Sequence, residues 1–139
     1  MAERQRIASD SPFEPTIGFS RAVRVGDRVL VSGTGPVVTG GRCPDDAGAQ
    51  ARRCFEIIAA ALAEAGASFD DVVRTRMYIT SAAHGDAVGA VHGELFGHLR
   101  PAATMVVVAG LLDPAWKVEI EAEAVLSPGP VLPSETVLR

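Results

Sequence analysis

A strictly alternating segment near the end of the chain limits the folds that this sequence can adopt. Residues 117–126 read Lys-Val-Glu-Ile-Glu-Ala-Glu-Ala-Val-Leu, so apolar and acidic residues alternate with a period of two. Successive side chains of a β-strand point to opposite faces of its sheet. Such a strand is typical of a sheet that has its hydrophobic core on one side only. The apolar face would comprise Val118, Ile120, Ala122 and Ala124, and the acidic face Glu119, Glu121 and Glu123.

Three other segments are predicted to form strands. Residues 22–33 alternate valine and arginine around Gly26 and Asp27, which predicts a β-hairpin with a tight turn. Residues 72–80 are rich in β-branched side chains, and residues 104–109 are apolar on both faces. Residues 1–20 are expected to be irregular, apart from a short strand around 6–8. Within 72–80 we expect Val73, Thr75, Met77 and Ile79 on one face and Arg74, Arg76 and Tyr78 on the other.

Two helices are expected between these strands. A helix over 46–65 would be capped by Asp45 or Asp46 and ended by Gly66. A second helix over 84–99 would end before Pro101. The first helix has an apolar stripe at helical spacing, made of Ala47, Ala51, Cys54, Phe55, Ile58, Leu62 and Ala65. The second would turn inward Val88, Val91, His92, Leu95 and Phe96.

The order of these elements predicts an α+β fold. The hairpin is followed by helix, strand, helix, strand and strand, and right-handed crossovers then give a mixed β-sheet with two helices on one face. A length of 139 residues favours one domain, which we place at 1–126; the proline-rich segment 127–139 is expected to be a loose C-terminal tail. The sheet face without helices combines arginines, glutamates and apolar side chains. Such a face suits burial against copies of the same chain, so we expect a homo-oligomer.

Charge and hydropathy disfavour several classes of partner. Thirteen Lys and Arg against 17 Asp and Glu give a net charge of −4 at pH 7, which does not favour nucleic acid. No apolar run reaches the roughly 18–20 residues that span a bilayer, and the first residues lack the apolar stretch of a signal peptide. We therefore expect a cytoplasmic protein with no nucleic-acid partner and no membrane partner. Cys43 and Cys54 are expected to be free thiols.

No pattern in the sequence indicates a metal site or a cofactor. His84, His92 and His98 are eight and six residues apart, spacings that do not put two imidazoles on one helix face. The sequence has neither a Gly-x-Ser-x-Gly nucleophile motif nor a glycine-rich phosphate loop followed by lysine. We therefore expect neither a metal nor a cofactor.

Three polar residues are candidates for a functional site, and each also has a structural explanation. His92 lies among apolar residues and is either a buried histidine with one hydrogen bond or an acid–base group in a pocket. Glu119 either pairs with Arg74 or Arg76 or, at a subunit boundary, orients a water molecule. Arg76 is either an ion-pair partner or the group that binds a ligand carboxylate.

Several segments together resemble the RidA/YjgF family of enamine and imine deaminases, over residues 17–125. They are Ile17-Gly-Phe-Ser-Arg-Ala-Val-Arg-Val-Gly26, Val29-Leu-Val-Ser-Gly33, Ala49-Gln-Ala-Arg52, residues 62–73, Arg100-Pro-Ala102 and Val118-Glu-Ile-Glu-Ala122. The resemblance implies a chorismate-mutase-like fold and a homotrimer built around a barrel of sheets. It also implies three clefts between subunits, each for a small-molecule ligand.

The sequence departs from this family where active deaminases bind the substrate carboxylate. Their arginine in Pro-Ala-Arg-Ser is matched by Ala103, and a cleft tyrosine is matched by Phe19. His92 stands where tyrosine is frequent, and Arg76 where threonine is common. The sequence thus resembles a branch of the family that lacks the catalytic arginine. The family's other cleft positions are matched by Gly33, by Thr104 for a serine, and by Glu119 for the glutamate that positions water.

Two functions are compatible with these residues. The first is an enzyme, without standard 2-imino acid deaminase activity, that hydrolyses or tautomerises a small imine, enamine or enol compound. Glu119 and His92 would be its catalytic residues. The alternative is a non-catalytic small-molecule-binding or regulatory trimer. Nuclease activity or inhibition of translation, which are attached to some members of the family, are disfavoured by the acidic charge. The ligand-binding residues would be Phe19, Gly33, Arg76, Ala103, Thr104 and Met105.

Overall fold

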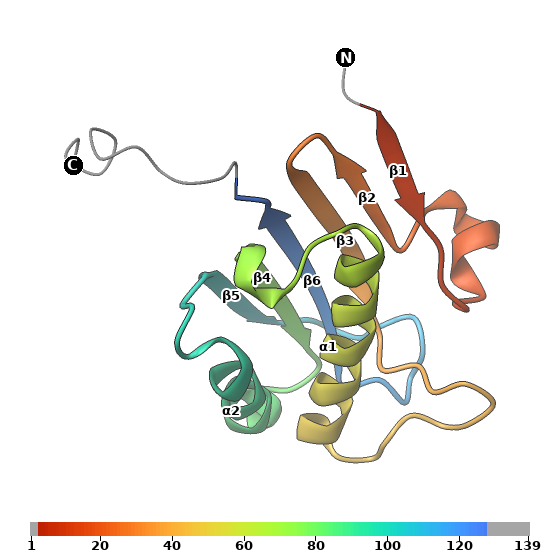
Figure 1. Cartoon of the computed structure of the whole chain (residues 1–139). Coiled ribbons are helices and arrows are strands. Elements are labelled where there is room, and N and C mark those ends of the chain that lie inside the picture. Colours follow the sequence, from red (N-terminus) through yellow and green to blue (C-terminus); the bar gives the residue numbers. More distant parts are fainter. Residues whose placement is uncertain (1–2, 128–139) are drawn as a thin grey trace.

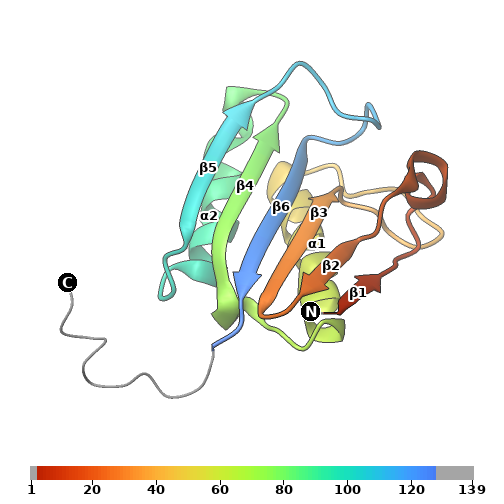
Figure 2. The same cartoon turned by 90° about the horizontal axis from the view of Figure 1, so that it is seen from above.

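The computed structural model describes residues 3–127, which contain one six-stranded sheet (Figure 1). Its strand order is β1-β2-β3-β6-β4-β5, and neighbouring strands are antiparallel except for the parallel pair β4 and β5. Figure 2 shows both helices behind the sheet, on the same side, so the predicted α+β fold is confirmed. The elements are β1 (Arg4–Ile7), β2 (Ala22–Val25), β3 (Arg28–Thr34), α1 (Ala47–Glu64), β4 (Val72–Ile79), α2 (Gly85–Phe96), β5 (Ala102–Val107) and β6 (Val118–Val125).

The alternating strand β6 lies inside the sheet, between β3 and β4. Its four apolar residues face the helices and are at most 3% exposed, whereas its three glutamates are half-buried on the opposite face. We call that opposite face the open face. The small side chains of Ala122 and Ala124 let α1 pack closely on β6 and β3. The alternation read from the sequence is therefore confirmed.

Both ends of α1 follow the signals in the sequence. The Asp46 side chain accepts a hydrogen bond of 2.9 Å from the backbone N–H of Ala49. After the last turn, Gly66 has φ +84°, and the N–H of Ala67 bonds back to the carbonyl of Leu62 at 2.8 Å. All seven residues of the predicted apolar stripe are buried, so this helix and its inner face are confirmed.

The other predicted elements need three corrections. A β-bulge in β4 shifts the register between Val72 and Arg74, so Val73 is 46% exposed rather than part of the core face. The second helix covers 85–96 rather than 84–99, since a 3-10 turn precedes it and Gly97 follows it. The strand predicted at 104–109 begins at Ala102 and is an edge strand.

The N-terminal segment is more ordered than the sequence suggests. It contains β1 and a π-helical turn at Glu14–Gly18, both within a region predicted to be mainly irregular. Glu14 accepts hydrogen bonds from Ser9 and lies 3.5 Å from Nε of Arg21, and both charged side chains are almost fully buried. Two charges seven residues apart carry no periodic signal, so this ion pair was not predictable from spacing alone.

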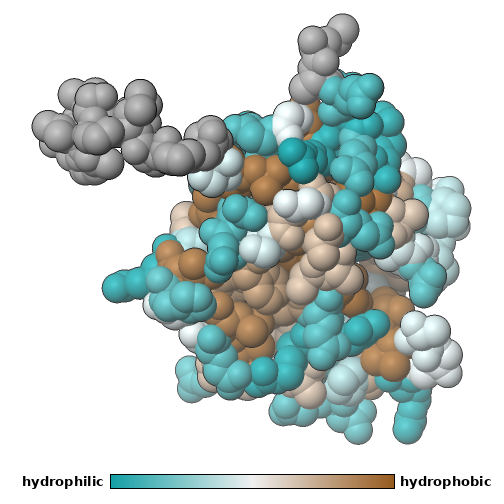
Figure 3. Space-filling view, viewed as in Figure 1, coloured by the Kyte–Doolittle hydropathy of each residue, from teal (hydrophilic) through white to brown (hydrophobic). Residues whose placement is uncertain are grey.

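The side of the molecule that the helices cover has a mixed surface. Apolar surface lies over the middle of this side, and hydrophilic residues surround it (Figure 3). Within residues 3–127, no helix has the length and hydropathy that crossing a membrane requires. The predicted tail 127–139 lies outside the described residues, except for Ser127.

Two identical substitutions on β6 test this packing. Val118 is fully buried, and Val125 on the same strand is 38% exposed. Val118→Ala removes buried methyl groups and leaves a small cavity, so we expect a loss of about 2 kcal/mol in the free energy of unfolding. Val125→Ala should change it by less than about 0.5 kcal/mol. Urea denaturation of both variants measures the difference, and equal losses would contradict the described core.

Candidate functional site

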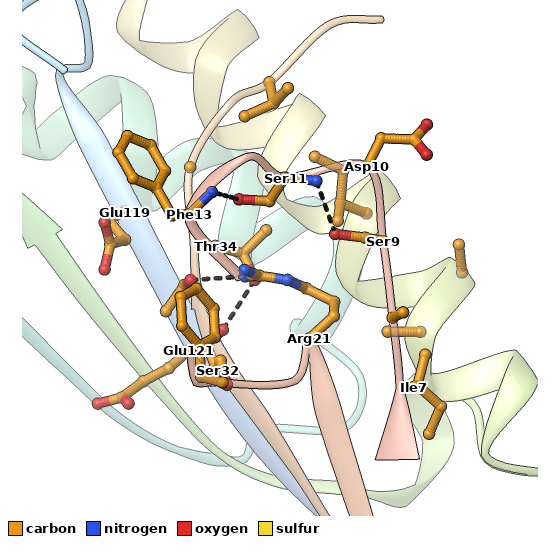
Figure 4. A pocket seen from close by; sticks show the side chains of 18 of the residues that line it. Ile7, Ser9, Asp10, Ser11, Phe13, Arg21, Ser32, Thr34, Glu119 and Glu121 are labelled. Atoms are coloured by element: carbon orange, nitrogen blue, oxygen red, sulfur yellow. Dashed lines mark hydrogen bonds between the residues drawn. The ribbon is translucent and has the colours of Figure 1, made fainter. Parts of the chain in front are cut away.

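A cavity of about 770 Å³ lies where the segment 7–21 meets the end of β3, the start of β6 and one side of α1. Figure 4 shows the side chains that converge on it, with Glu119 and Glu121 projecting from β6. This volume is in the range of sites that hold small organic molecules. Its apolar walls are formed mainly by Phe13, Ile17, Phe19, Leu112 and Trp116.

An aromatic pair fixes one wall of the cavity. The rings of Phe13 and Trp116 meet edge to face, with centroids 6.0 Å apart and an interplanar angle of 78°. Gly35 makes this possible, because a Cβ there would lie 2.6 Å from the Trp116 ring. Sequence reasoning missed Trp116, since the residues that surround it are far away along the chain.

Arg21 crosses beneath the cavity, and one nitrogen of its guanidinium makes two hydrogen bonds. Its Nη1 donates to the carbonyl of Gly33 at 2.6 Å and to Oγ1 of Thr34 at 2.8 Å (Figure 4). Its guanidinium carbon lies 5.3 Å from the centroid of the Phe19 ring. Because Glu14 neutralises its charge, Arg21 is a fixed part of the wall. No pattern in the sequence indicates this role of Arg21.

Glu119 differs from the other acidic residues of β6. A Cβ at position 33 would overlap its Oε2, so Gly33 provides the space that this carboxylate occupies. Within residues 3–127, the carboxylate has no hydrogen-bond or ion-pair partner. Burial raises the pKa of Glu119, the charge of Arg21 lowers it and that of Glu121 raises it, with a net increase. The raised pKa makes this carboxylate a stronger base than an exposed one, which suits it to accept and release a proton.

Three of the predicted site residues line the cavity, namely Phe19, Gly33 and Glu119. Arg76 does not, because its Nη1 lies 3.6 Å from Glu121 and 3.3 Å from Glu123 on the open face. Its charge is thus used by the two neighbouring glutamates. This pairing agrees with the first of the two interpretations of Arg76 given above, that of an ion-pair partner.

The predicted residues on β5 lie away from the cavity of the same chain. β5 forms one edge of the sheet, separated from β3 by β6 and β4. The register places Ala103 beside Thr75, Thr104 beside Arg76 and Met105 beside Met77. A single chain therefore does not bring these three residues to Glu119.

His92 also lies apart from Glu119, on the side of the sheet that the helices cover. Its Nε2 is 2.8 Å from Oγ1 of the buried Thr75, and its ring packs on Phe96 and Phe55 at centroid distances of 4.8 and 6.0 Å. Burial lowers the pKa of His92, which favours the neutral imidazole. These are the contacts of a histidine that belongs to the core and makes one hydrogen bond.

The described part of the chain has neither a metal-binding cluster nor a disulfide. Among residues 3–127, no three His, Cys, Asp or Glu side chains are grouped in a way that could hold a metal ion. Cys43 and Cys54 are free thiols, as predicted. Burial raises the pKa of Cys54, which keeps this thiol protonated.

The fold and the cavity define a class of small α+β protein, with a mixed six-stranded sheet, two helices on one face and a ligand-sized cavity at one end. The model of the family described as Endoribonuclease L-PSP matches residues 9–126. The chain therefore belongs to this family, and the resemblance to YjgF proteins is confirmed.

Similar proteins come from several bacteria and an archaeon. The chain is 40% identical over 124 residues to an uncharacterised protein of Streptomyces coelicolor, with 86% of this chain and 90% of that protein covered. It is 33% identical to a RutC family protein of Pyrococcus abyssi, with 78% and 87% covered. The solved structure of Rv2704 from Mycobacterium tuberculosis, a member of the YjgF/YER057c/UK114 family, is 44% identical, with a TM-score of 0.83 and coverages of 89% and 100%. The YjgF gene product of E. coli is 30% identical, with a TM-score of 0.74 and coverages of 86% and 92%.

The raised pKa of Glu119 predicts how its replacement changes stability with pH. A carboxyl group whose pKa is higher in the folded state stabilises the fold at low pH, and this contribution is lost as the pH rises through the raised pKa. Glu119→Gln imitates the neutral acid, so we expect the variant to be more stable than the wild type at pH 7. The difference should shrink as the pH falls below the ordinary carboxyl range.

Urea denaturation at several pH values measures this effect. Glu64→Gln is the matched control, because Glu64 lines the same cavity and is exposed to water. The control should stay within about 0.5 kcal/mol of the wild type at each pH. A Glu119→Gln variant that is less stable than the wild type at pH 7 would show that the carboxylate has a favourable partner.

Proposed function

We propose that this chain binds a small imine, enamine or enol-type compound and lacks standard 2-imino acid deaminase activity. The observation that carries the proposal is Glu119, a half-buried carboxylate without a partner among residues 3–127, in a cavity of molecular size. Ala103 stands where the resemblance places the arginine that binds the substrate carboxylate. Arg76 is paired with Glu121 and Glu123, so its position gives no support to a substitute role.

The proposed reaction is hydrolysis of a carbon–nitrogen double bond, with Glu119 as general base. Water adds its oxygen to the carbon of a protonated imine while Glu119 takes a proton from that water. Glu119 passes that proton to the nitrogen and takes the proton of the new hydroxyl group as the carbon–nitrogen bond breaks, so ammonia or an amine leaves and a carbonyl compound remains. Tautomerisation of an enamine or enol adds a proton at carbon and removes one from nitrogen or oxygen, and the carboxyl group of Glu119 can give the first proton and accept the second. In this proposal His92 supports the sheet through Thr75 and does not touch substrate.

We also propose that the cleft is completed between subunits of a homotrimer. On the open face Leu30 and Val106 are 43% and 42% exposed, together with the charged side chains of β4 and β6. Burying such apolar side chains between copies stabilises an assembly. A neighbour's β5 at the cavity would place the strand that carries Ala103, Thr104 and Met105 beside Phe19, Gly33 and Glu119. This arrangement gives the β5 residues a role that they cannot have within one chain.

Non-catalytic binding is the alternative function, and the missing arginine supports it as well. In that case the cavity and its aromatic walls hold a ligand as a signal, and Glu119 only binds. The ribonuclease activity in the family's name is not favoured by this cavity. Two arginines and five carboxylates line it within the described residues, a balance that repels polyanions.

Imine hydrolysis with and without a restored arginine tests the proposal. Imino acids are generated in place by an amino-acid oxidase, and semicarbazide trapping competes with the protein. We expect wild-type hydrolysis close to the rate without protein. Ala103→Arg should raise it by about 10- to 100-fold, since a charged hydrogen bond to the carboxylate contributes roughly 1.5–3 kcal/mol.

The control is Ala102→Arg, because Ala102 is equally exposed on β5 and its side chain points to the other face. Light scattering on the same samples should give three times the mass of one chain, and a monomer would remove the proposed intersubunit cleft. Efficient hydrolysis of imino acids by the wild type would contradict the proposal that Ala103 removes standard deaminase activity. If both proteins are inactive while the trimer is intact, the non-catalytic alternative is favoured.

A further inference from the structure

The charges around the cavity point to the kind of ligand that it selects. The two arginines that line it are both neutralised within the chain, Arg21 by Glu14 at 3.5 Å and Arg53 by Glu56 at 3.1 Å. Arg53 also donates to the carbonyl of Val37 at 2.6 Å. Within the described residues, each lining arginine therefore has an acidic partner, which weakens its attraction for an anionic group.

Among the carboxylates that line the cavity, Glu119 alone in residues 3–127 is both partly buried and unpaired. Asp10, Glu56 and Glu64 are exposed, so water screens their charges. Glu121 accepts a hydrogen bond from Tyr78 at 2.5 Å and lies 3.6 Å from Arg76. A charge that is partly removed from water attracts an opposite charge more strongly than an exposed one.

The walls near this carboxylate suit a positively charged organic group. Phe13, Phe19 and Trp116 line the same cavity, and the face of an aromatic ring attracts a cation. The volume of about 770 Å³ accommodates a ring-bearing molecule rather than an inorganic ion alone. Aromatic walls and one unpaired carboxylate thus occur together.

From this arrangement we infer that the cavity selects small nitrogen cations, ammonium or iminium compounds without a carboxylate, with Glu119 as the counter-charge. The inference rests on the proposed function and narrows its substrate class. An iminium ion is the protonated form of an imine and reacts with water more readily than the neutral form. The preference for a cation therefore favours the reactive form of the proposed substrate.

The inference predicts how binding responds to pH. Glu119 attracts a cation only when it is ionised, so affinity is present above its raised pKa and lost as the pH falls through it. The other charged groups around it are Arg21, which is paired with Glu14, and Glu121, which is paired with Arg76. An uncharged ligand of the same shape should show no such pH dependence.

Three benzyl compounds of matched size test the inference on the full-length protein. Benzylammonium, benzyl alcohol and benzoate are titrated at pH 7.5, and the indole N–H signal of Trp116 reports binding by NMR. Trp116 lines the cavity and is the single tryptophan of the chain. We expect benzylammonium to bind at least about tenfold more tightly than benzyl alcohol, and benzoate to bind most weakly.

Two variants assign the preference to one carboxylate. In Glu119→Gln, the affinity for benzylammonium should fall to that for benzyl alcohol. Glu64→Gln should keep the wild-type preference for benzylammonium. Melting temperatures confirm that both variants are folded. Equal affinities for benzylammonium and benzyl alcohol in the wild type would overturn the inference and leave the proposed function standing. If Glu119→Gln still prefers benzylammonium to benzyl alcohol, the inference is also overturned. If no compound shifts the Trp116 signal, both the inference and the proposed function are overturned.

Discussion

The period of two in β6 determines both the core and the site. Its apolar residues face the helices and its glutamates face the other side, because β6 lies between β3 and β4. On the open face Arg76 pairs with Glu121 and Glu123. Glu119, at the start of the strand, lies beyond that pair and beside Gly33, where no cation of residues 3–127 contacts its carboxylate. The alternation that builds the sheet thus also leaves one carboxylate available for a ligand.

A second constraint is the buried ion pair of Glu14 and Arg21, which holds the N-terminal segment against the end of β3. Removing one partner of a buried pair leaves an uncompensated charge and costs about 3–5 kcal/mol, although a well-packed apolar pair can be as stable. The pair therefore specifies where this segment lies. Because Phe13 and Phe19 belong to the same segment, the ion pair also positions the aromatic walls of the cavity.

The regular spacing of apolar residues was sufficient to predict the helices and strands that have one buried face. The hairpin, α1 and β6 were predicted from spacing, and Asp46 and Gly66 marked the ends of α1. Val73 was placed on the wrong face because a bulge breaks the period of two without changing the composition. Trp116 and Arg21 were missed, since their contacts join segments that are distant in sequence. Helical spacing placed His92 inward, but spacing alone does not distinguish a core position from a cleft.

The position of a bound cation would show whether Glu119 makes this cavity a ligand site. Crystals of the protein soaked with 4-bromobenzylammonium would locate the ring through the anomalous signal of bromine. We expect the bromine to lie between Phe13, Phe19 and Trp116, with the ammonium group within hydrogen-bond distance of Glu119. Bromine bound outside the cavity, or an ammonium group on Glu121 or Glu64 with Glu119 left unpaired, would contradict it.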